Sequence, residues 1–447
     1  MISYNTKRIF MALIIGLAGF LQACGGGSTS SPPPPGTLSG VVATGNSAIG
    51  LSGVSVIVFD ASTNAPTAPT VQTSSTGSYT FSLNAGSYYV KLYKQGYNPV
   101  PASALLTPVP LMVASGATTN NDVLMTLSAL TNIGWITGTV TSGATGAGGV
   151  LVAAEATGGV AYTSFTDSSG NYAIYNVPAS TTAYTMKAYI KGYSFTAPTA
   201  TVTAGTETTS NLSVTTTNAS ATVPVKFNLI AGGGVTDPAN MMVSLVHPVT
   251  KETIPGQSLT QVFSSSLEYS FSGVADGNYI VRATFANDTI VVDPDAIVKS
   301  GEPSVAVASA VPMPNPVLIK ATRSVDLVNP TNALSSTVPV DVVGTTPTFT
   351  WKAYSSTDNY VIEVMDASTG TVIWGGITGS GATATRNIVI PKTELSIVYN
   401  ADTKASAPLV MGKTYRWRIY ASKNQNTTPD WSLISMSEDQ TGLITIR

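Results

Sequence analysis

Apolar and polar residues alternate with a period of two along much of the chain, which predicts β-strands. In residues 88–92 every second residue is apolar, and Lys91 falls on the opposite face. Residues 184–190 repeat the pattern, with Lys187 and Lys191 opposite the apolar face. We therefore predict that each segment is a strand half buried in a β-sandwich, with its lysines turned outward.

The predicted strands recur in a unit of about 95 residues. Tyr79, Tyr172 and Tyr269 occupy equivalent positions, 93 and 97 residues apart. The first two copies end on a Gly-Tyr pair, Gly96-Tyr97 and Gly192-Tyr193, which suits either a ligand contact or a structural corner. The strands that open the three copies are residues 38–42 and 53–59, 135–140 and 149–154, and 223–227 and 242–246.

These copies resemble the carboxypeptidase regulatory-like domain, a transthyretin-like β-sandwich of seven strands that is common in exported bacterial proteins. The resemblance covers residues 37–215 well and residues 221–318 weakly. It implies a β-sandwich fold and no peptidase residues, because the family name refers to an accessory domain. A fold alone does not indicate a chemical activity.

The last part of the chain has a different pattern of strands. Residues 347–351 and 360–365 are followed, after a long loop, by the strand 414–421 with its Tyr-x-Trp-x-Ile pattern. This segment resembles a fibronectin type III-like sandwich, in which Trp351 would be the early core tryptophan.

The N-terminus reads as an export signal. Lys7 and Arg8 precede an apolar run, residues 9–21, that is too short to span a bilayer as a helix. The following Leu-Gln-Ala-Cys resembles the lipobox of bacterial lipoproteins, which implies a diacylglyceryl group on Cys24 and cleavage before it. The alternative is an ordinary secretory signal that leaves Cys24 as a free thiol. Gly25 after the cysteine favours export to the outer membrane.

We predict an all-β protein, a tandem array of β-sandwich domains after a lipoprotein signal peptide and a flexible tether. The predicted divisions are the signal peptide 1–23, the lipidated cysteine with a Gly/Ser/Pro tether 24–36, regulatory-like sandwiches 37–130 and 131–218, a diverged sandwich of the same type 219–318, and the fibronectin-like sandwich 319–447.

Composition excludes several classes of function. The chain has 21 basic and 23 acidic residues, and removal of Lys7 and Arg8 with the signal leaves a net charge of about −4, which offers nucleic acid no basic surface. Its single cysteine and single histidine rule out disulfides, iron–sulfur clusters and sites built from several histidines. We expect no cofactor, no metal and no catalytic residues.

Aromatic residues are the remaining candidates for ligand binding, because tyrosine and tryptophan rings stack on sugars. Six at periodic positions are predicted to lie in sandwich cores: Tyr79, Tyr88, Tyr172, Tyr184, Trp351 and Trp417. Six others are predicted to lie outward or in loops: Tyr93, Tyr97, Tyr189, Tyr193, Trp374 and Trp431. Among these, Tyr97, Tyr193, Trp374 and Trp431 are our candidate ligand-binding residues.

Two further features have competing interpretations. Asp293 and Asp295, with Asp288 nearby, form either a calcium site or a solvated turn. His247 precedes a proline at the end of an apolar strand and is predicted to be a turn residue rather than a catalytic base.

Three functions remain open. We favour a non-catalytic envelope lipoprotein that is anchored in the membrane at Cys24 and presents sandwich surfaces to a protein partner in a structural or adhesive role. The second is carbohydrate binding through exposed tyrosine and tryptophan. The third is a hydrolase that uses paired carboxylates, although no Asp/Glu pair lies in a recognisable glycosidase context.

Overall fold

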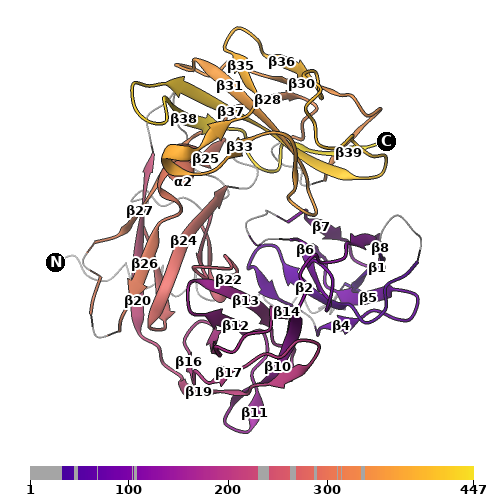
Figure 1. Ribbon diagram of the computed structural model, residues 1–447, viewed down its shortest axis with the longest axis vertical. Coiled ribbons are helices and arrows are strands. Elements are labelled where there is room, and N and C mark those ends of the chain that lie inside the picture. The colour runs from indigo at the N-terminus through magenta and orange to yellow at the C-terminus, as the bar shows by residue number, and fades with distance from the viewer. Residues whose placement is uncertain are drawn as a thin grey trace, which may run out of the picture.

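The chain is almost entirely β, and its strands form four sandwiches, as the alternation predicted (Figure 1). The computed structural model describes residues 33–447 apart from 45–48, 68, 103, 105–107, 230–240, 262–267, 286–288, 310, 314 and 334–337. Cys24 and the predicted signal lie outside the described residues. Within the described part of the chain, no helix has the length and apolar character needed to cross a membrane.

The first three sandwiches share one topology. In each, a long first strand pairs antiparallel with one neighbour and parallel with strands from the end of the same copy. In the first copy these strands are β1 (Gly36–Thr44), β5 (Ser78–Leu83), β8 (Thr118–Asn120) and β9 (Val123–Met125). Its second sheet contains β2 (Ser55–Asp60), β3 (Ala65–Pro66), β4 (Val71–Gln72), β6 (Gly86–Tyr93) and β7 (Leu111–Val113).

The second copy repeats this arrangement. Its first sheet contains β10 (Ile133–Ser142), β11 (Thr145–Gly146), β14 (Asn171–Pro178), β16 (Ser194–Phe195), β18 (Glu207–Thr209) and β19 (Leu212–Thr216). Its second sheet runs in the order β13 (Val160–Phe165), β12 (Leu151–Ala156), β15 (Tyr184–Tyr189) and β17 (Thr199–Ala200).

The third copy has two four-stranded sheets. The first runs β23 (Glu268–Val274), β20 (Ala221–Leu229), β27 (Val317–Arg323), β25 (Ile290–Val292). The second runs β22 (Thr253–Gln261), β21 (Met241–Val246), β24 (Gly277–Phe285), β26 (Ser304–Val307). Because β27 pairs with β20, this sandwich continues beyond residue 318, where we predicted its end.

In the fourth sandwich a three-stranded sheet packs on a larger one. The small sheet runs β28 (Leu327–Asn329), β30 (Thr348–Trp351), β36 (Ser396–Val398). The large sheet contains β29 (Val340–Val342), β39 (Leu443–Ile446), β37 (Thr414–Asn424), β31 (Asn359–Asp366), β32 (Val372–Gly375), β35 (Val389–Pro391) and β38 (Trp431–Met436). A hairpin, β33 (Ile377–Thr378) and β34 (Thr385–Arg386), encloses the 3₁₀ turn η1 (Gly381–Thr383).

The tyrosines that revealed the repeat are buried in the cores, as predicted. The hydroxyl of Tyr79 donates to the carbonyl of Asn121 at 2.6 Å, and that of Tyr172 donates to the carbonyl of Ser210 at 2.5 Å. Each bond ties the sandwich to the parallel strand that closes its first sheet. Tyr88, Tyr184, Trp351 and Trp417 are buried as well, which confirms the predicted core set.

A glycine on the first strand makes room for this contact in both copies. A Cβ on Gly138 would lie 1.8 Å from the carbonyl oxygen of Ser210, and one on Gly40 would lie 2.0 Å from that of Asn121. A side chain at either position therefore displaces the closing strand.

We predict that Gly138→Ala lowers the free energy of unfolding by about 1–3 kcal/mol, the usual range for forced overpacking. Hydrogen exchange of the β10 amides and equilibrium denaturation measure the effect. Ser142→Ala, at the exposed end of the same strand, is the control and should be nearly neutral. Equal stability of Gly138→Ala and the parent would contradict the close approach.

The sandwiches pack side by side and contact one another, rather than forming an extended row of separate domains (Figure 1). The side chains of Phe59 and Tyr89 project from the outer face of the first sandwich, and their stacked rings have centres 5.1 Å apart. The ring of Phe59 also contacts that of Phe165 in the second sandwich, edge to face, with centres 4.9 Å apart. These rings form one continuous core with the interior of the third sandwich. The second sheets of the first two copies are therefore covered on both faces.

Lys91 lies inside this shared core, so the prediction that the lysine of β6 faces outward is wrong. Its ammonium pairs with Glu252 of the third sandwich and lies 5.0 Å from the ring centre of Phe59 and 5.4 Å from that of Phe165. Both side chains of the pair are more than nine-tenths buried. Lys187, the equivalent residue of β15, is only partly exposed and pairs with Glu155.

The Gly-Tyr pairs form the corners between consecutive sandwiches. The amide of Gly96 donates to the side-chain oxygen of Asn176 at 2.7 Å, and the amide of Gly192 donates to the carbonyl of Gly273 at 2.7 Å. Asn176 and Gly273 each lie four residues past the repeat tyrosine, and both have positive φ, 57° and 66°. The same joint is thus used twice, which favours the structural interpretation of the pair.

A short helix, α2 (Pro294–Ser300), follows β25 of the third sandwich and contacts the fourth, where we predicted a calcium site or a solvated turn. Asp293 caps it, and Asp295 accepts the amide of Leu433 in β38 at 2.9 Å. Val298 packs against a buried cluster around Trp431. The fourth sandwich is therefore held by side chains as well as by the chain itself.

We predict that Glu252→Gln lowers the free energy of unfolding by about 3–5 kcal/mol, because it leaves the Lys91 ammonium buried without a counter-charge. Equilibrium denaturation and hydrogen exchange of the β2, β6 and β12 amides report the loss. The double variant Lys91→Met/Glu252→Leu removes both charges and should recover most of it. A Glu252→Gln protein as stable as the parent would show that the Lys91–Glu252 pair does not hold the first three sandwiches together.

Candidate functional site

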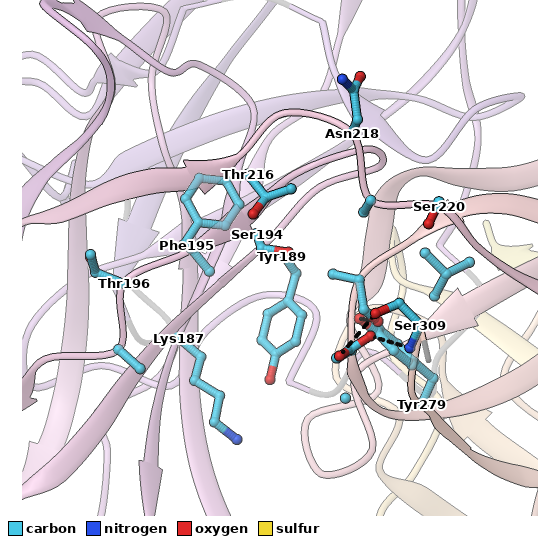
Figure 2. Close-up of a pocket in the computed structure, with 17 residues that line it drawn as sticks. Lys187, Tyr189, Ser194, Phe195, Thr196, Thr216, Asn218, Ser220, Tyr279 and Ser309 are labelled. Carbon is cyan, nitrogen blue, oxygen red and sulfur yellow. Dashed lines mark hydrogen bonds between the residues drawn. The ribbon is translucent and has the colours of Figure 1, made fainter. Parts of the chain in front are cut away.

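A pocket of about 480 Å³ lies between the second and third sandwiches (Figure 2). The second sandwich supplies Lys187, Tyr189 and Phe195, from β15 and β16. The linker between the two sandwiches supplies Asn218, and the third supplies Asp276, in the turn between β23 and β24. The corner at Gly192 lies beside it, because Gly192 precedes the lining residue Ser194 and bonds to Gly273, next to the lining residue Val274. The joint itself thus creates the pocket.

The lining combines aromatic rings with neutral hydrogen-bonding groups. Figure 2 shows Phe195 and Tyr189 on one wall, facing Tyr279 and Ser309 on the other. The lining also includes hydroxyls and an amide, those of Ser194, Thr196, Thr216, Ser220 and Asn218. Such a surface offers donors, acceptors and flat apolar faces in one cavity.

The two charged residues of the lining are already engaged by protein partners. The ammonium of Lys187 lies 2.7 Å from Oε2 of Glu155. The carboxylate of Asp276 accepts the amide of Ser309 at 2.6 Å and its hydroxyl at 3.3 Å. The pocket therefore presents little net charge to a ligand.

Glu155 forms a cluster of polar groups beneath the pocket. Besides Lys187, it accepts the hydroxyl of Tyr189 at 2.7 Å, and Nε2 of His247 lies 3.2 Å from the same oxygen. Burial raises the pKa of Glu155, but the hydrogen bonds from His247, Lys187 and Tyr189 outweigh burial and lower the pKa to about 2. Burial and the adjacent carboxylate raise the pKa of Tyr189. Glu155 is thus held ionised and Tyr189 protonated.

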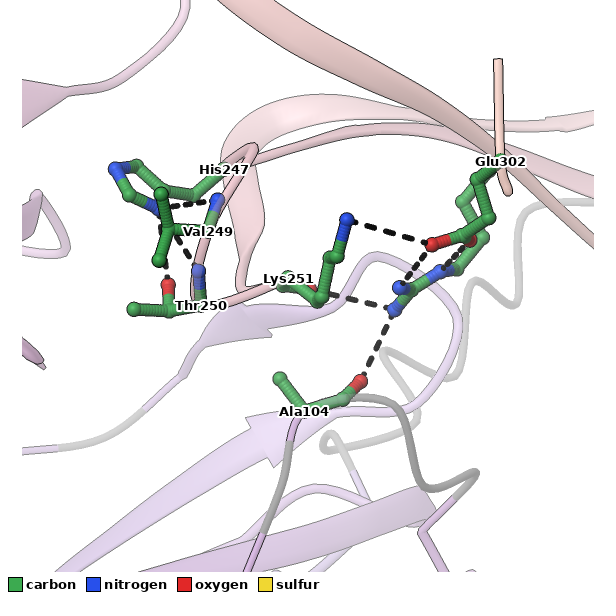
Figure 3. Close-up of polar contacts among 7 residues, drawn as sticks. Ala104, His247, Val249, Thr250, Lys251 and Glu302 are labelled. Carbon is green, nitrogen blue, oxygen red and sulfur yellow. Dashed lines mark hydrogen bonds and ion pairs between the residues drawn. The ribbon is translucent and has the colours of Figure 1, made fainter. Parts of the chain in front are cut away.

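His247 is fully buried and lies in the turn after β21, as predicted (Figure 3). Its Nδ1 accepts the amides of Thr250 at 3.1 Å and Val249 at 3.3 Å. Because Nδ1 accepts, the ring proton lies on Nε2, which donates to Glu155. The imidazole therefore bridges the turn of the third sandwich to the second.

Thr250, His247 and Glu155 have the order of a hydrolase triad, with the Thr250 hydroxyl 3.2 Å from Nδ1. The chemistry does not fit, because two backbone amides occupy the lone pair that a general base needs. Neither His247 nor Thr250 lines the pocket. We assign the arrangement to structure.

A second polar network fixes the third sandwich to the first (Figure 3). Arg282 makes a two-pronged pair with Glu302, at 2.5 Å and 2.9 Å, and donates to the carbonyl of Ala104 at 3.0 Å. Lys251 lies 4.0 Å from Glu302, and burial lowers the pKa of Lys251. These residues have structural partners rather than an open cavity.

The structure does not bring the four candidate aromatics together. Trp374 is 1% exposed in the core of the fourth sandwich and donates to Asp402 at 2.7 Å, so its predicted outward position is wrong. Trp431 is also buried, under Arg386, whose guanidinium lies 5.1 Å from its ring centre. Tyr97 is half-buried against the first core, and Tyr193 alone is exposed, at 36%.

The other two residues predicted to face outward are also covered. Tyr189 is buried at the Glu155 cluster, and Tyr93 packs against the shared core. Both belong to the sheets that a neighbouring sandwich covers. Their predicted outward position is wrong for the same reason as that of Lys91.

Asp293 and Asp295 belong to a helix cap, and Asp288 lies outside the described residues. Asp293 accepts the amide of Asp295, and Asp295 in turn accepts the amide of Leu433 and pairs with Lys299 at 3.2 Å. Among the residues that the structure describes, no three His, Cys, Asp or Glu side chains are grouped to hold a metal. Asp167 accepts the amides of Ser169 and Asn171 and so stabilises a turn.

The residues of the joint and the pocket were missed by the sequence analysis, although one signal was present. Residues 56–59 and 150–154 are unbroken apolar runs rather than alternating ones. Such runs are typical of strands covered on both faces. The pocket residues Phe195 and Asn218 lie in irregular polar sequence and carry no comparable signal.

No protein-family profile matches the chain, and no curated protein matches it in sequence. Among solved structures, similar chains include the Bacillus anthracis TIE protein (17% identity, 65% of this chain and 50% of that one, TM-score 0.17). A streptococcal ancillary pilin has 12% identity over 64% of this chain and 98% of its own, with a TM-score of 0.19. A DUF3823 family protein from Bacteroides uniformis has 11% identity over 51% and 100%, with a TM-score of 0.23.

This chain spans half the length of the TIE protein chain. TM-scores of this size carry no argument about function. The sandwich architecture rests on the strand pairing described above.

We predict that the contact between the second and third sandwiches becomes less stable as the pH falls from about 4.5 to about 2. The folded pKa of Glu155 lies below its ordinary value, so its stabilisation is present above pH 4.5 and is lost as protons bind the folded state. The loss is up to about 3 kcal/mol. Denaturation across this range measures it, and Glu155→Gln should flatten the profile. The exposed Glu268→Gln is the control, and an equal change in both variants would contradict a special role for Glu155.

Proposed function

We propose that this chain is a non-catalytic lipoprotein of the cell envelope, anchored through lipid on Cys24 at the outer membrane or cell surface. Its sandwiches would present surfaces for a structural, adhesive or protein-binding role. The observation that carries this proposal is the shared core around Lys91 and Glu252, which makes the first three sandwiches one packed body. A body of this kind suits the presentation of surfaces in a fixed geometry.

Strand order supports the finer domain assignments. In each of the first three sandwiches a first strand lies between an antiparallel and a parallel neighbour, which supports one domain type for all three. In the fourth, β28, β30 and β36 form a separate small sheet, which fits a fibronectin type III-like arrangement. We propose these two domain types on that basis.

The anchor and tether would set how this body meets its surroundings. Residues 25–36 could extend to about 40 Å, at 3.3 Å per residue. The first strand begins at Gly36, directly after this segment. A rigid body on a flexible tether can search the nearby surface without changing its own shape.

The structure does not support carbohydrate binding through Tyr97, Tyr193, Trp374 and Trp431. Trp374 and Trp431 are buried in separate clusters of the fourth sandwich, and Tyr97 and Tyr193 lie at two different corners. No row of exposed rings therefore forms from them. A protein partner stays the favoured class for the outer surfaces.

We predict that Cys24→Ser releases the protein from the membrane fraction, because the serine hydroxyl cannot take the thioether-linked lipid. Fractionation of the producing cells and mass spectrometry of the N-terminal peptide measure the change. Ser28→Ala in the tether is the matched control and should stay in the membrane. A Cys24→Ser protein that remains in the membrane fraction as fully as the parent would refute the anchor.

A further inference from the structure

The pocket between the second and third sandwiches has no role in anchoring the protein. We propose that it binds a neutral saccharide unit of one or two sugar rings. This goes beyond the anchored scaffold and does not depend on Cys24. The residues involved differ from the exposed aromatics that the sequence suggested.

The size and position of the pocket suit such a ligand. Its volume of about 480 Å³ lies within the range of roughly 300–1,000 Å³ that is usual for small-molecule sites. It also lies between two domains, where such sites are common. A site between sandwiches gains walls from two directions, which a single sandwich surface does not provide.

The chemistry of the lining selects the class of ligand. The half-buried ring of Phe195 offers a flat apolar face on which the C–H face of a sugar ring can pack. The hydroxyls of Thr216 and Ser220 and the amide of Asn218 can both donate and accept, as alternating sugar hydroxyls require. An entirely apolar ligand would leave these polar groups without partners.

Charge argues against an anionic ligand. Lys187 is the cation of the lining, and its ammonium is paired with Glu155 at 2.7 Å. Asp276, on the opposite wall, adds a negative charge. A phosphate or carboxylate would have to compete with Glu155 for Lys187 while facing Asp276, whereas a neutral polyol meets neither difficulty.

The walls are already fixed in place. Tyr189 is held by its bond to Glu155 at 2.7 Å, and the hydroxyl of Tyr279 donates to the carbonyl of Ala275 at 3.0 Å. The two rings lie 6.2 Å apart, edge to face, so the second sandwich contacts the third directly beside the cavity. A preformed cavity lowers the conformational entropy that the protein must lose when a ligand binds.

The full-length protein in detergent tests the proposal by titration with four neutral sugars: maltose, cellobiose, galactose and N-acetylglucosamine. Inorganic phosphate and diglycine are the contrasting probes. Saturation-transfer NMR and calorimetry should show at least one sugar binding with a Kd of about 1 mM or lower, and neither contrasting probe binding as tightly.

Two variants locate the binding. Asn218→Trp, at the linker edge of the cavity, should obstruct it and weaken sugar binding at least about tenfold, while Thr217→Trp, an equally exposed neighbour outside the lining, should leave binding unchanged. Phe195→Leu keeps apolar volume but removes the flat ring, and it should also weaken binding. Unchanged thermal unfolding shows that each variant is folded.

The proposal is overturned if none of the four sugars binds, or if phosphate or diglycine binds more tightly. It is equally overturned if Asn218→Trp binds the sugar as well as Thr217→Trp does. Release of the protein from membranes by Cys24→Ser is scored separately, so failure here leaves the anchored scaffold standing.

Discussion

The structure depends on the need to cover the outer faces of two sheets. Ile57 and Phe59 in β2, and Leu151 and Ala153 in β12, turn apolar side chains away from their own sandwich cores. In isolated domains these faces would meet water, at a free-energy cost that grows with the exposed apolar area. Packing them against the third sandwich removes that cost and brings the first three copies together.

The charges in the joint fix its geometry more than they stabilise it. A buried ion pair such as Lys91–Glu252 loses hydration, so the pair is close to neutral against an apolar replacement. The pair nevertheless restricts how the sandwiches can pack, because any other arrangement would leave a buried charge without a partner. Glu155 imposes the same restriction through His247. Apolar area drives the association, and these contacts select one arrangement.

Much of the fold could be predicted from alternation and repetition. The core positions of Tyr79, Tyr172 and Trp417 follow from a period of two, because a sandwich buries every second residue. Alternation cannot say whether the opposite face meets water or another domain, which is why Lys91 was misplaced. Trp374 was misplaced because the loop sequence around it conceals a buried strand. The helix α2 was missed because seven residues show little helical periodicity. Its Asp-Pro start and the glycine at its end are nevertheless recognisable helix boundaries in the sequence.

The candidate site could not be predicted, because it belongs to a pair of sandwiches rather than to one. Phe195 and Asp276 are 81 positions apart, and the corner at Gly192 helps to bring their surroundings together. The same corner places Tyr189 between the pocket and Glu155. Any ligand that binds both walls must therefore favour the docked arrangement of the two sandwiches over a separated one. Protonation of Glu155 acts on the same equilibrium in the opposite direction. The pocket and the joint are thus thermodynamically linked, and neither can change its occupancy or its charge without affecting the other.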